Sequence, residues 1–294
     1  MRILFVTSSR IGDAVLSTGL LDHLLKQYPE ATFTIFTGPV AEDVFARMPR
    51  RDLTIVRDKM RFGRHWLDLW WYAIRHWWEL VVDIRASALS YVVPTLHRAV
   101  KRKSRGHKTE QLARMLKLDP PPLPVMWTNE EDRALAAKLL PEGGPIIGLG
   151  PTANWDGKVW PPERFAALAA RLRESALPGA RVAVFAGPGA KEAALAAPLL
   201  AAVPDAIDLT GKLSLPEAAA CLARCAVFIG NDSGLMHISA ASRTPTLGLF
   251  GPTPADEYAP AGVCAAPVLS EDNTMAGLSV ERAFEAVKSL IARP

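Results

Sequence analysis

The fold is decided by the stretch Ala226-Val-Phe-Ile-Gly-Asn-Asp-Ser-Gly-Leu-Met-His-Ile-Ser-Ala-Ala and by Pro245-Thr-Leu-Gly-Leu-Phe-Gly-Pro-Thr-Pro shortly after it. Residues 226–229 are an apolar run typical of a buried strand, 230–234 indicate a tight turn, and 235–241 predict a helix with one apolar face. The second stretch opens with another buried strand. Strand, turn, helix and strand in this order predict a parallel sheet, whose turns at the carboxyl edge commonly bind ligands.

The turn before this helix has two interpretations. Asp232 or Ser233 can cap the helix, and the free N–H groups of its first turn, at the positive end of the helix dipole, suit a phosphate. In the simpler interpretation these side chains only cap the helix and Gly234 only forms the turn. The turn alone leaves both open.

The start of the chain repeats this pattern. Residues 2–7 predict a buried strand, 8–13 a loop, and 14–26 a helix with Val15, Leu20, Leu21 and Leu24 among its apolar residues. Two such openings, one in each half, predict an α/β protein with two nucleotide-fold domains facing each other across a cleft.

Length and composition agree with a globular protein of two domains. The chain has 294 residues, of which 49% are hydrophobic and 22% charged, and a formal net charge of +4 that points to an anionic partner. Cys221, Cys225 and Cys264 lack metal-site spacing, which fits a reducing cytoplasm, and Cys221 and Cys225, which share a helix face, are expected to be packing thiols. We expect neither a secretory signal nor a membrane span, since Arg10 and Asp13 interrupt the first apolar run and no run of about 18 uncharged apolar residues exists.

Five motifs resemble those of the bacterial lipopolysaccharide heptosyltransferases, the glycosyltransferase family 9 group typified by ADP-heptose transfer to the inner core. The resemblance covers nearly the whole chain, and the motifs occur in the order found in that family. They are Arg10-Ile-Gly-Asp-Ala-Val-Leu, Leu80-Val-Val-Asp-Ile-Arg, Lys158-Val-Trp-Pro-Pro-Glu-Arg-Phe, Gly230-Asn-Asp-Ser-Gly-Leu-Met-His and Phe250-Gly-Pro-Thr.

The resemblance implies a GT-B fold, with two Rossmann-like domains whose parallel sheets face each other across a cleft. We expect an acceptor-binding domain over residues 1–128, a linker at about 119–144, and a nucleotide-sugar domain over 145–278. A C-terminal helix over 279–294 is expected to pack back on the first domain.

The resemblance also gives Asp13 the role of catalytic base. A nucleotide sugar carries a diphosphate leaving group, so one base and one anion clamp are enough for transfer, and a base opposite the diphosphate inverts the anomeric centre. The competing interpretation of Asp13 is an N-cap of the helix over 14–26.

The anion clamp is expected around Lys158, which lies on a glycine-containing loop after a strand and which the resemblance favours as a phosphate ligand. Asp232 is anionic, so a sugar or ribose hydroxyl is its expected partner. His237 is either a packed histidine or a ligand. The remaining donor-site candidates are Ser233, Gly234, Leu235, Thr253, and the weaker Thr152 and Asn154.

Basic residues concentrate in the first half, most densely in 97–108. Their target is a nucleic acid, an anionic membrane surface or a phosphorylated and carboxylated substrate. No recognised nucleic-acid motif is visible, which argues against the first. In the family the amino-terminal domain takes a polyanionic lipid A-linked acceptor. The acceptor-site candidates are Arg10, Gly12, Arg61, Arg64, Lys101, Arg102, Lys103 and Arg105.

Residues 57–78 crowd tryptophans among cations, and helical spacing aligns Trp66, Trp70, Ile74 and Trp77 in one stripe. A helix that packs on a sheet needs only one apolar stripe, and this aromatic sector is wider. The segment is therefore either core or a peripheral contact with a membrane interface.

Together these features predict an inverting, metal-independent glycosyltransferase that moves heptose from ADP-heptose onto the lipopolysaccharide core. No D-x-D motif is present, so we expect no metal, and no cofactor is expected. The expected location is the cytoplasm, at the cytoplasmic face of the inner membrane. Another nucleotide sugar or acceptor, or a non-catalytic protein that binds nucleotide sugars or polyanions, stays open as an alternative.

Overall fold

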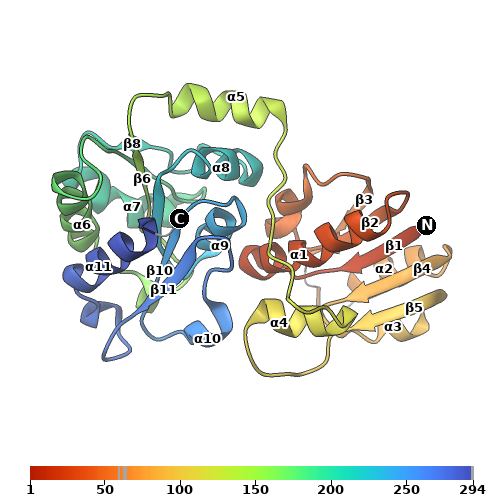
Figure 1. The fold of residues 1–294 in the computed structure, drawn as a ribbon. Coiled ribbons are helices and arrows are strands. Elements are labelled where there is room, and N and C mark those ends of the chain that lie inside the picture. Colours follow the sequence, from red (N-terminus) through yellow and green to blue (C-terminus); the bar gives the residue numbers. More distant parts are fainter. Residues whose placement is uncertain (59, 62–64, 293–294) are drawn as a thin grey trace. The chain divides into compact units, whose positions relative to one another are not determined.

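The computed structural model describes residues 1–58, 60–61 and 65–292 (Figure 1). The chain divides into two compact units, Met1–Trp127 and Thr128–Pro294, and each unit is built on its own parallel sheet. The α/β class and the two-sheet organisation predicted from the sequence are confirmed.

The first unit has five parallel strands in the order β3-β2-β1-β4-β5. The chain moves from β1 toward β3 at one edge and later from β3 across to β4 and β5 at the other. Because crossovers between parallel strands are right-handed, connections that run in these two directions lie on opposite faces of the sheet. The strands are β1 (Arg2–Val6), β2 (Thr32–Thr37), β3 (Arg51–Val56), β4 (Trp78–Asp83) and β5 (Thr95–Val100).

Helix α1 (Ile11–Gln27) packs against η1 (Pro39–Phe45) and α4 (Lys108–Ala113); a short turn, η3 (Arg114–Leu116), follows α4. The other face of the sheet is covered by α2 (His65–Ala73) and α3 (Leu89–Val92), whose buried residues share one hydrophobic cluster with the strands.

The aromatic segment differs from the expected long helix. Helix α2 ends at Ala73, and Trp78 is already the first residue of β4, with its indole Nε1 donating to the Ala73 carbonyl at 2.9 Å. The basic segment was not expected to contain a strand, yet its first residues belong to β5. Within residues 1–58, 60–61 and 65–292, no helix combines the length and the apolar character needed to cross a membrane.

The extended stretch after residue 118, expected to be a linker, packs on α1. The backbone N–H of Val125 donates to Thr18 Oγ1 at 2.9 Å. A Cβ on Gly19 would lie 2.5 Å from the Pro122 carbonyl oxygen, so only glycine allows this close approach. Beyond it lies the helix α5 (Glu130–Leu139), which opens with a capping box at Asn129.

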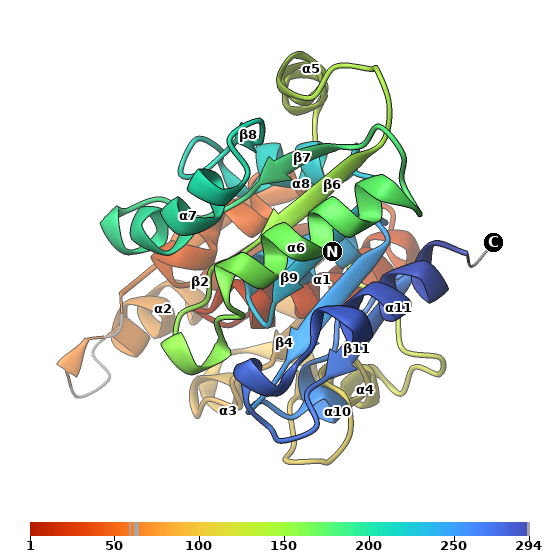
Figure 2. The same cartoon turned by 90° about the vertical axis from the view of Figure 1, so that its left-hand side faces the viewer.

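The second unit has six parallel strands in the order β11-β10-β9-β6-β7-β8. Helices α6 (Pro162–Glu174), α7 (Ala190–Ala202) and α11 (Val280–Ile291) pack in one layer on the sheet and share a core cluster with its strands (Figure 2). Helix α8 (Leu215–Leu222) packs against α5 and against α9 (Gly234–Ala241). The strands are β6 (Ile146–Gly150), β7 (Arg181–Val184), β8 (Ile207–Asp208), β9 (Val227–Asn231), β10 (Thr246–Phe250) and β11 (Ala265–Leu269), and the remaining short elements are η4 (Asp156–Lys158), α10 (Ala255–Tyr258) and η5 (Met275–Gly277).

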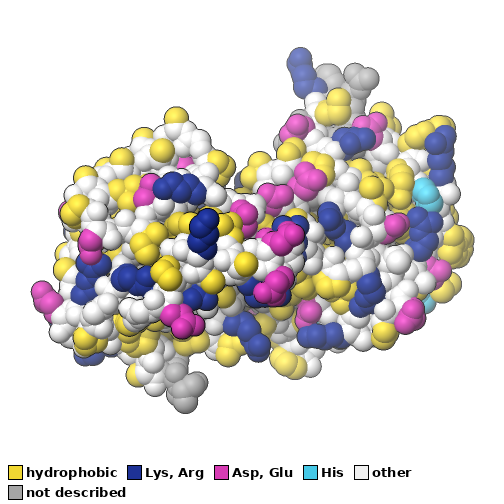
Figure 3. All heavy atoms as spheres, turned by 90° about the horizontal axis from the view of Figure 1, so that it is seen from above, with side chains coloured by type: hydrophobic (Ala, Val, Ile, Leu, Met, Phe, Trp, Pro, Cys, Tyr) yellow, Lys and Arg dark blue, Asp and Glu magenta, His cyan; other side chains and the backbone are white. Residues whose placement is uncertain are grey.

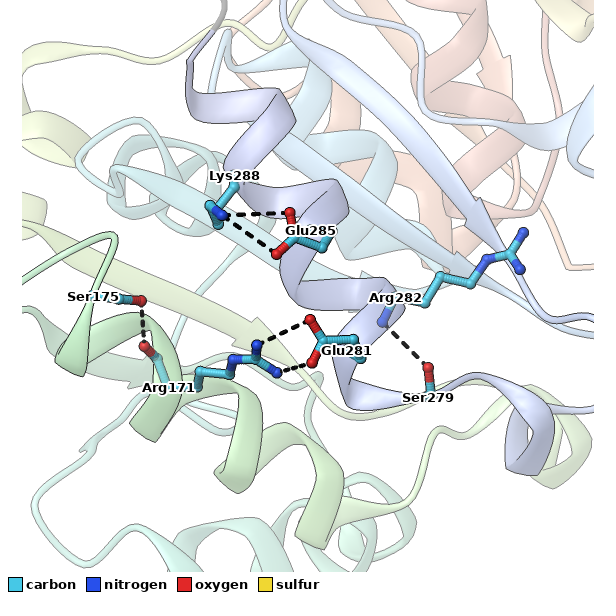
Figure 4. A network of polar contacts seen from close by, with 7 residues as sticks. All are labelled: Arg171, Ser175, Ser279, Glu281, Arg282, Glu285 and Lys288. Carbon is cyan, nitrogen blue, oxygen red and sulfur yellow. Dashed lines mark hydrogen bonds and ion pairs between the residues drawn. The ribbon is translucent and has the colours of Figure 1, made fainter.

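The C-terminal helix α11 buries its apolar face inside the second unit, and the expectation that it packs back on the first domain stays a prediction. Its buried residues, Phe284 and Val287 among them, belong to the core cluster that includes α6. Both terminal guanidinium nitrogens of Arg171 on α6 contact Glu281, and Lys288 pairs with Glu285 on α11 itself (Figure 4). Within this unit, the apolar face of α11 packs against α6, β10 and β11.

Candidate functional site

A pocket of about 160 Å³ lies at the carboxyl edge of the first sheet. Its walls come from the loop after β1, the first turns of α1, the loops after β4 and β5, and α4. The lining residues are Ser8, Asp13, Leu16, Ile84, Arg85, Lys101, Lys108 and Leu112.

Asp13 lies in the first turn of α1 and lines this pocket. The alternative interpretation, an N-cap, is wrong, because the helix begins earlier, at Ile11, and its N-cap residue is Arg10. The Asp13 carboxylate accepts only a long hydrogen bond from Ser8 Oγ, 3.4 Å from Oδ2, among the interactions resolved for this group. The dipole of α1 stabilises a carboxylate at this position, so Asp13 is placed to present an anionic oxygen to the pocket.

Three cations line the same pocket as Asp13. Lys101, an acceptor candidate from the sequence, follows β5, and its backbone N–H continues the sheet by donating to the Asp83 carbonyl at 2.9 Å. Arg85 and Lys108 were not among the sequence candidates. Arg85 could have been found, because it ends one of the five motifs. Three cations beside one carboxylate suit a ligand that carries both anionic groups and hydroxyls.

Asp83 fixes the loop that carries Arg85. The carboxylate is fully buried and accepts hydrogen bonds from the backbone N–H groups of Arg85 and Ser87, each at 2.8 Å. The hydroxyls of Ser87, at 2.6 Å, and Ser90 donate to the same carboxylate. The Arg85 guanidinium lies 5.5 Å from the centre of the Trp66 ring. The aspartate of this motif therefore has a positioning role.

The other acceptor candidates lie outside the pocket lining. Gly12 is in the first turn of α1, and Arg10 precedes it with an exposed side chain. Arg61 is exposed ahead of α2, and Arg64 lies outside the described residues. On the face drawn in Figure 3, Lys and Arg side chains are interspersed with Asp and Glu, unlike the continuous basic surface that favours nucleic acid. Exposed side chains in the loop between β5 and α4 are Arg102, Lys103 and Arg105.

In the second unit the structure brings Lys158 and Asp232 together. Lys158 Nζ lies 2.7 Å from Asp232 Oδ2, and the two side chains are 19% and 8% exposed. The pair joins the loop after β6 to the loop after β9, although 74 residues separate its members. Asp232, expected to meet a hydroxyl of the donor, is first of all the counter-ion of the candidate phosphate ligand.

Asn231, which the sequence did not single out, holds this loop in place. Its side chain is fully buried at the end of β9. Oδ1 accepts from the Trp160 backbone N–H at 3.1 Å, and Nδ2 donates to the Pro151 carbonyl at 2.8 Å. Both ends of the loop that carries Lys158 are thus tied to β9.

Two buried hydroxyls of the second unit, one of them at the N-terminus of α9, have no hydrogen-bond partner among the described residues. Ser233 is the N-cap residue, but its side chain makes no capping hydrogen bond. Over the part of the chain that the structure describes, Ser233 Oγ and Thr253 Oγ1 are buried and have no hydrogen-bond partner. Buried hydroxyls are normally bonded. Ser233 Oγ and the first-turn N–H groups at Gly234 and Leu235 are donors suited to an oxyanion, and Thr253 lies in the loop after β10, the strand that pairs with β9.

The remaining donor candidates differ in their exposure. His237 is 4% exposed on α9, and Thr152 is 3% exposed after β6. Asn154 is exposed, and its carbonyl accepts from Lys191 at 3.4 Å. Among the residues for which side chains are described, no three His, Cys, Asp or Glu side chains form a group that could hold a metal ion.

Comparison with known proteins identifies similar chains. Residues 86–288 match the family described as glycosyltransferase family 9 (heptosyltransferase). The lipooligosaccharide heptosyltransferase 2 of Haemophilus influenzae is 26% identical, over 88% of this chain and 86% of that protein.

Solved structures agree in fold. The Escherichia coli ADP-heptose lps heptosyltransferase II superposes with a TM-score of 0.77 at 22% identity, over 99% of this chain and 98% of that one. The E. coli heptosyltransferase WaaC with ADP-2-deoxy-2-fluoro heptose superposes with a TM-score of 0.73 at 19% identity, over 98% of this chain and 99% of that one. These similarities show that the chain has the GT-B fold, with two Rossmann-like domains.

Proposed function

Because this chain belongs to glycosyltransferase family 9, we propose that it transfers heptose from ADP-heptose to a lipid A-linked lipopolysaccharide core. The protein is a glycosyltransferase, and the donor and acceptor are the proposed part. Support for the donor comes from the solved structure of the E. coli heptosyltransferase WaaC with ADP-2-deoxy-2-fluoro heptose. Support for the acceptor comes from curated relatives named lipooligosaccharide and lipopolysaccharide heptosyltransferase 2.

The donor diphosphate is proposed to bind at the N-terminus of α9. Lys158 supplies the cation, and Ser233 Oγ, Thr253 Oγ1 and the first-turn N–H groups of α9 supply hydrogen bonds. As the bond between the anomeric carbon and the diphosphate oxygen breaks, negative charge grows on the leaving ADP, and these fixed donors stabilise it. Asp232 holds Lys158 in place and meets a sugar or ribose hydroxyl.

The acceptor is proposed to bind at the pocket of the first unit, and the observation that carries this is the presence of Asp13 and three cations in one pocket. Arg85, Lys101 and Lys108 bind the acceptor's phosphate or carboxylate groups. Asp13 accepts the proton of the attacking hydroxyl, whose oxygen forms the new bond to the anomeric carbon. Attack from the side opposite the diphosphate inverts that carbon. We place the reaction in the cytoplasm, at the inner-membrane face that presents a lipid-linked acceptor.

The test is transfer from a panel of nucleotide sugars to deacylated core acceptor in EDTA. Asp13→Asn is compared with Asp22→Asn, a matched change on the same helix, where Asp22 forms a surface ion pair with Lys26. We expect turnover with ADP-heptose in the unaltered protein. Asp13→Asn should lower the turnover about 10²–10⁴-fold, whereas Asp22→Asn should leave the turnover unchanged. Another preferred donor would overturn the proposed substrate, and full activity of Asp13→Asn would overturn the proposed base. Loss of turnover in EDTA would overturn metal independence.

A further inference from the structure

Helix α2 has two apolar faces, although a helix that covers a sheet needs one. Leu69 and Ala73 are fully buried against the sheet. On the outward side, Leu67 is 60%, Trp70 37% and Trp71 54% exposed. Their spacing of three and four residues places these three side chains on one face of the helix, and the described interactions show no element packed over it.

The neighbouring elements extend this apolar surface. Trp77, in the connection from α2 to β4, is 59% exposed. Tyr91 and Val92 on α3 and Leu96 on β5 are each at least 60% exposed. The inward residues of α3 belong to the same hydrophobic cluster as those of α2, so both elements cover the same face of the sheet.

This concentration is not the ordinary scatter of apolar side chains on a surface. Among the described residues, fifteen large hydrophobic side chains are exposed, and seven of them lie between residues 67 and 96. Nearly half of the set therefore falls in about a tenth of the chain. Single exposed apolar residues are normal, whereas a contiguous apolar surface marks an interaction site.

The charge of this region fits an anionic partner. Residues 57–98 contain seven Lys and Arg against four Asp and Glu. Of the acidic residues, Asp83 is buried and Asp68 is ion-paired. The Arg75 guanidinium lies 3.8 Å from the centre of the Trp71 ring, so a cation stands beside the exposed indole.

We propose that the outward face of α2, with Trp77 and the exposed residues of α3 and β5, binds the surface of an anionic phospholipid bilayer. Indole rings favour the headgroup level, where neighbouring arginines meet lipid phosphates. A helix of nine residues is too short to span the bilayer, so it lies along the interface. A second copy of the chain is a poorer occupant, since cores of protein interfaces are depleted of charge. The proposal deepens the proposed function, because a lipid-linked acceptor requires the enzyme to work at a membrane.

The test is flotation of the full-length protein with vesicles of phosphatidylcholine and phosphatidylglycerol, without donor or acceptor, so its result is independent of transferase activity. The unaltered protein is expected to float with these vesicles at low salt, and less with phosphatidylcholine alone. Trp71→Gln and Trp77→Gln are each expected to lower partitioning onto the vesicles about tenfold, because each variant buries less apolar area on binding. Trp155→Gln is the matched control, because Trp155 in the second unit is 54% exposed, as Trp71 is. Its partitioning is expected to stay unchanged.

Vesicles with brominated acyl chains provide a second measurement that does not depend on weakened binding. Their quenching of tryptophan fluorescence should fall in Trp71→Phe, which keeps an apolar ring on this face of the helix. No flotation at low salt would overturn the proposal, as would an equal loss in Trp155→Gln. A dimer in sedimentation that Trp71→Gln converts to monomer would also overturn it, by showing that a second copy covers the face.

Discussion

Replacing Lys158 by methionine should weaken both the fold of the second unit and the transfer reaction, for separate reasons. The change leaves the Asp232 carboxylate, 8% exposed, without the ammonium that lies 2.7 Å away. A buried charge that loses its partner keeps its desolvation cost and loses the compensating attraction. Asp232→Asn has the converse effect on Lys158, which is more exposed and reaches water more readily.

The magnitude follows from the geometry of the pair. A hydrogen bond between charged groups contributes about 1.5–3 kcal/mol net. Because the Lys158 side chain is 19% exposed, water screens part of the attraction, and we expect Lys158→Met to cost about 2 kcal/mol. The double variant Lys158→Met/Asp232→Asn should recover most of this loss, since no buried charge remains. The coupling energy of the cycle is expected to be about 2 kcal/mol.

The assay uses two buried thiols in the same unit. Cys221 is fully buried and Cys225 6% exposed; burial raises the pKa of Cys221 to about 11 and the pKa of Cys225 further. Neither thiol reacts in the folded state, so the rate of alkylation at pH 8 reports opening of this unit. A loss of about 2 kcal/mol accelerates alkylation about thirtyfold.

Turnover separates the catalytic role from the structural one. Lys158→Met should slow transfer about 10²–10³-fold, as the loss of one fixed donor to a developing anion does. The double variant should regain stability without regaining turnover. Strictly additive single changes, with coupling below about 0.5 kcal/mol, would refute the ion pair, and full turnover of the double variant would refute the phosphate role.

Three further predictions concern other groups. Ser233→Ala should weaken ADP binding about tenfold in calorimetry. Thermal stability should stay equal or rise, because the buried Ser233 hydroxyl lacks a partner in the described chain. Lower stability with unchanged affinity would contradict this prediction. Arg85→Gln should raise KM for the acceptor about tenfold without changing ADP affinity, whereas Arg102→Gln, outside the pocket lining, should leave both parameters unchanged. The Ser270 hydroxyl, with backbone and side-chain donors of the following turn, lowers the pKa of Asp272 below its ordinary value of 3.8. The Asp272 carboxylate therefore contributes to the stability of this loop above pH 3.8, and the contribution is lost as the pH falls through the lowered pKa. Hydrogen exchange of this loop should accelerate in acid. Asp272→Asn should abolish that pH dependence.

The central part of the fold could be predicted because its signals are local. Strands β9 and β10 are continuous apolar runs, as strands buried on both faces of a parallel sheet are. A turn that ends in glycine leads from β9 into the apolar helix α9. Strand β5 escaped prediction because it lies at the edge of its sheet. It exposes Leu96, His97 and Arg98 in succession, so its sequence reads as a basic surface segment.

The candidate sites were only partly predictable for a related reason. Asp13 and Lys158 stand in motifs, whereas the pairing of Lys158 with Asp232 depends on how two distant loops meet across neighbouring strands. The start of α1 at Ile11 has no local signal, because Arg10 caps it without a side-chain hydrogen bond. The cation Lys108 lies on α4 and reaches the pocket only through the packing of α4 on α1.

The tryptophans show the limit of periodicity. Helical spacing placed Trp66, Trp70 and Trp77 in one stripe, but the helix ends at Ala73. Trp66 packs partly buried on the core, whereas Trp70 and Trp77 are exposed. Spacing identifies which residues share a face of a helix, and only the bounds of the helix decide which of them belong to it.

The position of α11 has a consequence for taking the enzyme apart. Helix α11 completes a layer on the second unit's own sheet, and the stretch up to Val125 is anchored to α1 of the first unit. One break between Trp127 and Thr128 would give two uninterrupted chains, each carrying every strand of its sheet. Producing the two halves as separate polypeptides, labelled isotopically one at a time, and recombining them would test which half retains each ligand.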